Sequence, residues 1–263
     1  MNQNELLALY DSEMRQHIEY HDSKRDASAH AVRHTSLTDE GGFVLHSTLD
    51  AATVECEIEA QIAYFEAIGS DFEWKVFDYD EPPDLRQRLV ARGFESDESE
   101  AIMVLDLDEA PASLFEPVTA PILHIQEQST VADVAIVEEA VWQQDYSYLV
   151  ARLIRDLSHE QNILDLYIAY IEGKPASTGW IYYHPGTSFA SLWGGSTMEQ
   201  YRGFGLYSAL LAVRAQKARR RGFRLLTVDA SPMSEPILCR HGFQILTYAH
   251  ACTWQVGSNP AQA

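Results

Sequence analysis

Hydrophobic and polar positions follow two different periods along the second half of the chain. Residues 131–144 and 148–157 carry apolar side chains at helical spacing. Residues 163–171 and 178–184 are rich in β-branched and aromatic residues and flank the turn Glu172-Gly173-Lys174-Pro175, so they predict a pair of strands. This half is therefore expected to begin with two helices, followed by strands.

The pattern continues to the end of the chain. Residues 188–193, after the Pro185-Gly186 turn, predict a third strand. A long helix is expected from about 205 to 221, because basic residues fill its last turns and Gly222 follows as a C-cap. A strand, a short helix and a closing strand are expected over residues 223–229, 234–241 and 243–255. The expected order, α-α-β-β-β-α-β-α-β, belongs to the α+β class.

The first half resembles the second when its residue numbers are shifted by 149. Residues 75–94 then coincide with 224–243 at Asp, Pro, Leu, Gly and Phe without a gap. Two related domains in tandem are the simplest explanation, and chance matching of common residues is the alternative. The first copy is shorter upstream, so we expect it to start on a helix near residues 5–20 and to lack one or two opening strands.

A proline-rich stretch without a period separates the two copies. We therefore expect a first domain over residues 1–112, a linker over 113–121 and a second domain over 122–258. Nearly all of the net charge of −20 lies in the first half, since residues 1–118 hold 27 acidic and 8 basic residues. Such an acidic half disfavours nucleic acid and anionic membranes and favours a cationic partner, unless it is simply a well-solvated surface.

Composition excludes several other classes. No apolar run approaches the roughly 20 residues that a membrane span needs, and the N-terminus lacks a secretory pattern. Cys56, Cys239 and Cys252 are too few and too scattered for a disulfide framework or a zinc site, and the ten histidines show no metal-ligand spacing. We expect a cytoplasmic protein without a metal, and the oligomeric state stays open.

Gly203 and Gly205 lie where a predicted strand ends and the long helix begins. A helix N-terminus offers free backbone N–H groups and a partial positive charge, and glycines let the backbone approach a phosphate closely. Arg202 adds a charge and Ser208 adds a hydroxyl. The segment therefore suits a pyrophosphate, although it lacks the third glycine of the dinucleotide fingerprint and the Gly-Lys-Ser/Thr of a Walker loop.

Together with the order of elements, this segment resembles the signature Gln/Arg-x-x-Gly-x-Gly/Ala of the GNAT acyltransferase superfamily. The resemblance covers about residues 120–256 and implies a GNAT-like acyl-CoA N-acyltransferase fold that uses acetyl-CoA. The signature fits from Gln200 or from Arg202, and we prefer Arg202 because the family's following small-x-Leu-Leu then falls on residues 208–211. Tyr207 then replaces the small residue that is usual in the last place.

The resemblance also implies which residues hold the cofactor. Thr197 and Met198 fall where the fourth strand receives the pantetheine arm, with a backbone N–H there as the oxyanion donor. Ser231 falls where many members carry an Asn that contacts the cofactor. The expected cofactor-binding residues are Thr197, Met198, Arg202, Gly203, Phe204, Gly205, Leu206, Tyr207, Ser208 and Ser231.

The usual catalytic groups of the family are missing. By register, its glutamate base falls on Ser191 and its tyrosine acid falls on Leu238. We assign Asp229, at a strand end, as the candidate catalytic residue, with His184 and Tyr207 as the other titratable candidates. The counterpart of the glycine segment in the first copy has lost its glycines and carries Glu55, Glu57 and Glu59, so no CoA site is expected there.

The expected activity is acetyl transfer from acetyl-CoA to a primary amine of a small molecule or a protein, with a cationic acceptor favoured by the acidic first half. A non-catalytic acyl-CoA-binding or regulatory module is the alternative, and the vacant acid and base positions favour it. A third possibility is a different acyl group or reaction on the same fold.

Overall fold

The computed structural model describes residues 1–38 and 41–257. Its backbone contacts divide into two compact units, the first comprising residues 1–103, 229–236 and 245–257, and the second residues 104–228 and 237–244. No helix in these ranges combines the length and apolarity of a membrane span. In the same ranges, no group of three or more His, Cys, Asp or Glu side chains is arranged to hold a metal ion.

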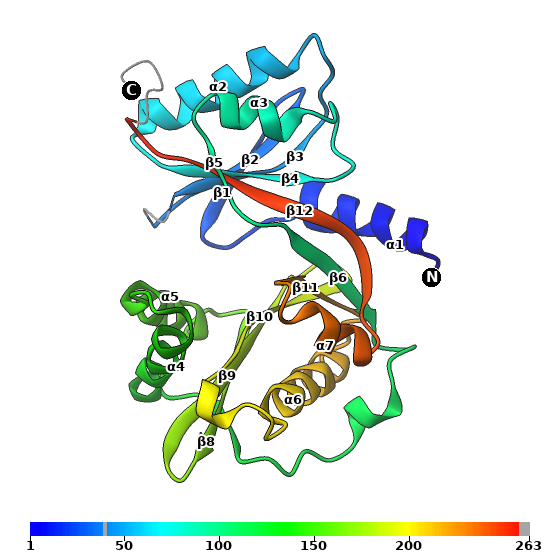
Figure 1. The fold of residues 1–263 in the computed structure, drawn as a ribbon, viewed down its shortest axis with the longest axis vertical. Helices are drawn as coiled ribbons and strands as arrows, with labels where there is room; N and C mark the ends of the chain where they lie inside the picture. The colour runs from blue at the N-terminus through cyan, green and yellow to red at the C-terminus, as the bar shows by residue number, and fades with distance from the viewer. Residues whose placement is uncertain (39–40, 258–263) are drawn as a thin grey trace. The chain divides into compact units, whose positions relative to one another are not determined.

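The first unit is a mixed sheet with helices on both faces. Its strands lie in the order β1-β2-β3-β4-β12, and β5 pairs with β12. β3 and β4 are parallel, because α2 crosses over between them, and the other pairs are antiparallel. α2 and α3 lie on one face and α1 on the other (Figure 1). The elements are α1 (Gln3–Tyr10), a π-helical segment (Asp11–Gln16), β1 (Ser23–Ala27), β2 (Ala31–Ser36), β3 (Gly42–Ser47), α2 (Val54–Ile68), β4 (Phe72–Phe77), α3 (Leu85–Ala91) and β5 (Glu95–Ser96).

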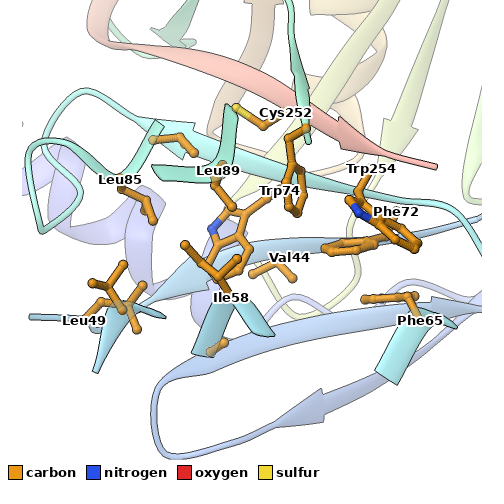
Figure 2. Packing of buried hydrophobic residues seen from close by; sticks show 14 residues of the cluster. Val44, Leu49, Ile58, Phe65, Phe72, Trp74, Leu85, Leu89, Cys252 and Trp254 are labelled. Atoms are coloured by element: carbon orange, nitrogen blue, oxygen red, sulfur yellow. The ribbon is translucent and has the colours of Figure 1, made fainter. Parts of the chain in front are cut away.

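Alternate residues of β4 form the core of this unit. Phe72, Trp74 and Val76 are buried in one cluster with residues of α2 such as Ile58 and Phe65 (Figure 2). This follows from the two-residue period of a strand, which sends every second side chain to the same face. The rings of Phe65 and Phe72 stack with centroids 4.2 Å apart.

The second unit has the predicted order of elements as far as the short helix α7, with one strand added at its start. The sheet order is β11-β10-β9-β8-β7, with β10 and β11 parallel and the other pairs antiparallel. α4 and α5 cover one face and α6 the other (Figure 1). The elements are a 3₁₀ turn (Ala112–Phe115), β7 (Ile122–Ile125), a 3₁₀ turn (Gln128–Thr130), α4 (Ala132–Trp142), α5 (Ser147–Leu157), β8 (Leu164–Ile171), β9 (Lys174–Tyr183), β10 (Phe189–Thr197), a 3₁₀ turn (Glu199–Tyr201), α6 (Leu206–Arg220), β11 (Leu225–Ala230) and α7 (Glu235–Arg240).

The boundaries of the two units differ from those expected from the sequence. The differences lie at the closing strand β12 (Gln244–Trp254) and at the strand β6 (Glu100–Asp106). β12 pairs with β4 from Ala249↔Phe77 to Trp254↔Phe72. Its Trp254 is 1% exposed in the core of the first unit (Figure 2). Contacts therefore place residues 245–257 in the first unit and 104–112 in the second. That residues 1–112 and 122–258 are separate domains stays a prediction.

The expected linker, residues 113–121, is held along α6. Leu114 is 2% exposed, and the Gln216 side-chain amide donates to the carbonyls of Leu114 and Glu116, both at 2.9 Å. The guanidinium of Arg219 lies 4.5 Å from the centre of the Phe115 ring. Proline has no backbone N–H to donate, and it interrupts any helical or strand pattern in this stretch. The backbone carbonyls of the stretch can still accept hydrogen bonds from side chains of α6.

The two copies correspond element by element. The first begins on α1, as expected, and its described residues show no counterpart of β7 before β1 to β3, which match β8 to β10. The shift of 149 also relates two side-chain contacts. Glu59 pairs with Arg92 at 2.6 Å, and the corresponding Ser208 and His241 are hydrogen-bonded at 2.9 Å. The same positions thus join the same two helices in both copies, which supports the repeat.

Candidate active site

β10 and β11 separate after a short paired stretch. The strands are parallel partners at Phe189↔Leu225, Ala190↔Leu226 and Ser191↔Thr227. β10 runs on to Thr197, yet in the described part of the chain no further pair joins it to β11. Beyond Ser191 this side of β10 is therefore a strand edge without a neighbouring strand, the kind of edge that can pair with a ligand.

A bulge in β10 lies in the unpaired stretch. Gly194 and Gly195 have φ of +66° and +82°, and the pairing with β9 changes register between Gly194 and Thr197. A Cβ on Gly194 would lie 2.3 Å from the ring of Trp180, and one on Gly195 would lie 3.0 Å from the ring of Tyr207. The predicted strand ended at residue 193 and missed this bulge, although a Gly-Gly pair within a strand pattern is a signal for one.

The glycine segment opens α6 as expected. Gly205 is the N-cap with φ of +75°, Gly203 has φ of +84°, and no side chain caps the helix. A Cβ at either glycine would meet no atom within 4 Å, so the backbone is open on that side. Phe204 is 66% exposed, whereas Leu206 is 3% exposed and anchors the first turn in the core. The amides of this turn therefore face an accessible surface with the positive end of the helix dipole behind them.

The residues before the helix connect it to the end of β10. The Nε atom of Arg202 donates to the carbonyl of Thr197 at 3.3 Å. The Thr197 hydroxyl lies 2.7 Å from that of Ser177 on β9. The amide of Met198 donates to the carbonyl of Ala176 at 3.0 Å, so it is already bonded within the sheet and is not available as the oxyanion donor in this arrangement.

Tyr207 and Ser208 point from the first turn of α6 in different directions. The Tyr207 ring packs on Gly195 at the bulge, and its hydroxyl has no hydrogen bond to any described residue. Burial raises the pKa of Tyr207, so its hydroxyl stays protonated at neutral pH. The Ser208 hydroxyl is instead hydrogen-bonded to Nε2 of His241 at 2.9 Å.

Asp229 and Ser231 belong to the first unit, whereas residues 197–208 belong to the second. Asp229 forms a hydrogen-bonded ion pair with Lys75 of β4. The carbonyl of Ser231 accepts the amides of Ser234 and Glu235, both at 3.0 Å, at the start of α7. The Asp229 carboxylate is therefore occupied by Lys75 in this structure, and its assigned catalytic role stays a prediction.

The two positions that lack the usual acid and base are both buried. The Ser191 hydroxyl lies 2.8 Å from Nε2 of His184 and accepts the indole N–H of Trp193 at 2.8 Å. Burial lowers the pKa of His184 to about 4, so the imidazole is neutral at pH 7. Leu238 is 1% exposed and packs as a core residue of α7.

Arg214 of α6 is a buried cation. It is 2% exposed and has no carboxylate partner among the described residues. Its guanidinium donates to the carbonyls of Trp180 at 3.2 Å and Trp193 at 3.0 Å, which join β9 to β10 just before the bulge. Burial lowers its pKa to about 10. An arginine in a predicted helix gives no signal of this role, because the carbonyls that it bonds come from other elements.

No family model and no curated protein matches the chain, but solved structures do. A GCN5-related N-acetyltransferase from Kribbella flavida matches with a TM-score of 0.66 and 14% identity, over 91% of this chain and 90% of its own. A tandem GNAT protein from the clavulanic acid biosynthesis pathway matches with a TM-score of 0.60 and 14% identity, over 98% and 94%. A GCN5-related N-acetyltransferase from Sphaerobacter thermophilus matches with 0.59 and 13%, over 98% and 86%.

These matches extend over both halves of the chain. They support the mixed α and β architecture of the chain. The resemblance inferred from the sequence is thus confirmed at the level of architecture: the chain has the α+β fold of the GCN5-related N-acetyltransferases.

Proposed function

We propose that the protein is an acyl-CoA-dependent N-acyltransferase that moves an acetyl group from acetyl-CoA to a primary amine. The observation that carries the proposal is the continuity between the unpaired edge of β10 and the uncapped N-terminus of α6. The pantetheine arm contains amides that can pair with a strand edge, and a pyrophosphate matches the free amides and positive dipole of a helix start. The two features are joined by residues 198–205.

The residues present fit such a ligand. Backbone amides of Gly203 to Leu206 are the proposed donors to the pyrophosphate, and Arg202 adds a positive charge beside them. Open space at both glycines leaves room for the phosphate oxygens. Thr197 lies at the end of the strand edge that would receive the pantetheine arm. The Tyr207 ring packs on Gly195 at the bulge, so we propose that it contacts the thioester end of the arm rather than the phosphates.

Direct transfer forms one bond and breaks another. The amine nitrogen attacks the thioester carbonyl carbon, the C–S bond breaks, and the amine loses one proton while the departing thiolate gains one. Tyr207 is the group that we propose as the acid, because its hydroxyl is protonated at neutral pH and has no partner among the described residues. Asp229 is the proposed base, and this role requires that its ion pair with Lys75 open so that the carboxylate can reach the amine.

Release of free CoA thiol tests the activity. We expect release from acetyl-CoA to depend on an added primary amine, within a panel of neutral and cationic amines. Tyr207→Phe is expected to lower kcat by about 10²-fold, as removal of a general acid does, and to leave the Kd for acetyl-CoA within about threefold of wild type. An unchanged kcat in Tyr207→Phe would remove the acid assignment.

The alternative is a non-catalytic acyl-CoA-binding module. The burial of Ser191 and Leu238 at the usual base and acid positions favours it. It predicts saturable acetyl-CoA binding with no amine-dependent thiol release from acetyl-, succinyl- or long-chain acyl-CoA. Turnover with only one of these three would instead identify the acyl group.

A further inference from the structure

Trp142, at the end of α4, is held in place although half of it is exposed. Its indole N–H donates to Oε2 of Glu138 at 3.2 Å and to the Ser196 hydroxyl on β10 at 3.1 Å. Ser196 in turn donates to Glu138 at 2.6 Å, and Glu138 is 2% exposed. The ring remains 49% exposed. A large aromatic face is therefore exposed to solvent in one fixed orientation. Because hydrogen bonds already order the side chain, a ligand that binds to it does not lose binding free energy to immobilise it.

Trp193, on β10, repeats this arrangement. Its indole N–H donates to the Ser191 hydroxyl at 2.8 Å, which is itself bonded to the buried His184. The ring is 47% exposed and meets the Tyr182 ring edge-on with centroids 6.2 Å apart. Each half-exposed indole is thus fixed by a buried serine of the same strand.

Both rings lie on the face of the sheet that α4 and α5 cover. Trp193 is the register partner of Trp180, and residues opposite each other on antiparallel strands point to the same side. Trp180 packs with Leu149 and Leu153 of α5, and Trp142 itself belongs to α4. The two anchoring serines flank the Gly194-Gly195 bulge and are five residues apart, at most about 16 Å along an extended strand.

The charged residues of α4 and of the segment after it are all acidic. No Lys or Arg occurs between Arg92 and Arg152, whereas α4 and the segment after it carry Asp133, Glu138, Glu139 and Asp145. Arg152, whose guanidinium lies 5.9 Å from the Tyr182 ring, is ion-paired with Asp156. An organic cation would find both a favourable field and two aromatic faces here, and an anion would find neither.

We propose that Trp142 and Trp193 form the acceptor site, and that the acceptor is an extended aliphatic diamine. This proposal rests on the proposed acetyl transfer. The far ammonium group would lie on an indole face, where cation–π attraction holds it, while the near amine, in its neutral form, reaches the thioester beside the bulge. A chain of about eight carbons lies within the upper bound of about 16 Å that separates the two anchoring serines along β10.

Equilibrium titration of the full chain with the eight-carbon α,ω-diamine tests this site without requiring turnover. Octylamine, with one charge, and the eight-carbon diol, with none, are the matched ligands. We expect the diamine to bind at least tenfold more tightly than either. Trp142→Leu and Trp193→Leu should each weaken the diamine about tenfold and octylamine less than threefold, whereas the corresponding Phe variants, which keep an aromatic face, should retain most of the affinity.

Several results would overturn the proposal. These are equal binding of the diamine and octylamine, absence of saturable diamine binding, tighter binding of phenethylamine than of the diamine, or equal losses for both ligands in the Leu variants. In the acetylation assay, the Leu variants should raise KM for the diamine about tenfold and change kcat less than threefold. Transfer to other amines but not to the diamine refutes the acceptor assignment, whereas no transfer to any amine refutes the proposed function and leaves the titration to decide the aromatic site.

Discussion

Three buried polar side chains of the second unit are held by hydrogen bonds. Glu138 accepts from Thr178, Ser196 and Trp142, His184 bonds Ser191, and Arg214 donates to backbone carbonyls. Such groups are costly to bury and are retained where hydrogen bonds compensate for the lost water. All three bond β10 or a side chain that bonds β10. These hydrogen bonds therefore stabilise the irregular shape of β10.

The pKa of Glu138 gives a prediction for stability. Burial raises it above its ordinary value of 4.5, against the opposing effect of hydrogen bonds from Ser196, Thr178 and Trp142. A raised folded-state pKa contributes stability that is present below the unfolded value and is lost as pH rises through the folded value. The free energy of unfolding of wild type relative to Glu138→Gln should therefore fall as pH rises above 4.5. Urea unfolding of both proteins from acid to neutral pH measures this, and a relative stability that rises with pH would contradict it.

At the scale of elements, β10 changes character along its length. It begins with a partner on each side, loses β11 after Ser191, bulges at Gly194 and ends beside the start of α6. The sequence predicted the strand and the helix start, because hydrophobic period and glycine punctuation are local signals. It did not predict the bulge contacts with Trp180 and Tyr207, because these depend on which strands and helices become neighbours.

A methyl group at the bulge should be costly. Gly194→Ala places a Cβ 2.3 Å from the Trp180 ring at a backbone φ of +66°, so we expect a loss of about 2–4 kcal/mol of stability from strain and overpacking together. Gly186→Ala is the matched control, since Gly186 has φ of +86° with no atom within 4 Å and should show only the strain of about 1 kcal/mol. Denaturant unfolding of the two variants measures the difference, and equal losses would show that Trp180 yields without cost.

At the scale of the whole molecule, the order of elements and the internal repeat were readable from the sequence, and the partner of the last strand was not. β12 reads as the closing strand of the second copy, yet it pairs with β4, more than 170 residues earlier in the chain. Strand pairing is decided by complementary edges and core packing, as with Cys252 and Trp254 in the first unit, and a local pattern carries no information on which edge is chosen.

In the candidate site, too, local features could be predicted from the sequence and contacts between distant residues could not. The glycine segment was found because a phosphate-binding helix start needs small residues in consecutive positions. The ion pair of Asp229 with Lys75 joins residues 154 positions apart, so no local pattern could report it. The hydrogen bond between Ser208 and His241 likewise joins residues that are 33 positions apart in the sequence.

Calorimetric titration of acetyl-CoA into wild type, Gly205→Glu and Gly173→Glu tests the central claim most directly. Gly205 and Gly173 share a left-handed φ, +75° and +76°, and open space around the Cβ position, but Gly173 lies in the hairpin between β8 and β9. We expect equal affinity for wild type and Gly173→Glu. For Gly205→Glu we expect a loss of at least about 100-fold, because a carboxylate would then face the pyrophosphate at the helix N-terminus. Equal affinity of Gly205→Glu and wild type would contradict the assignment of the acyl-CoA site.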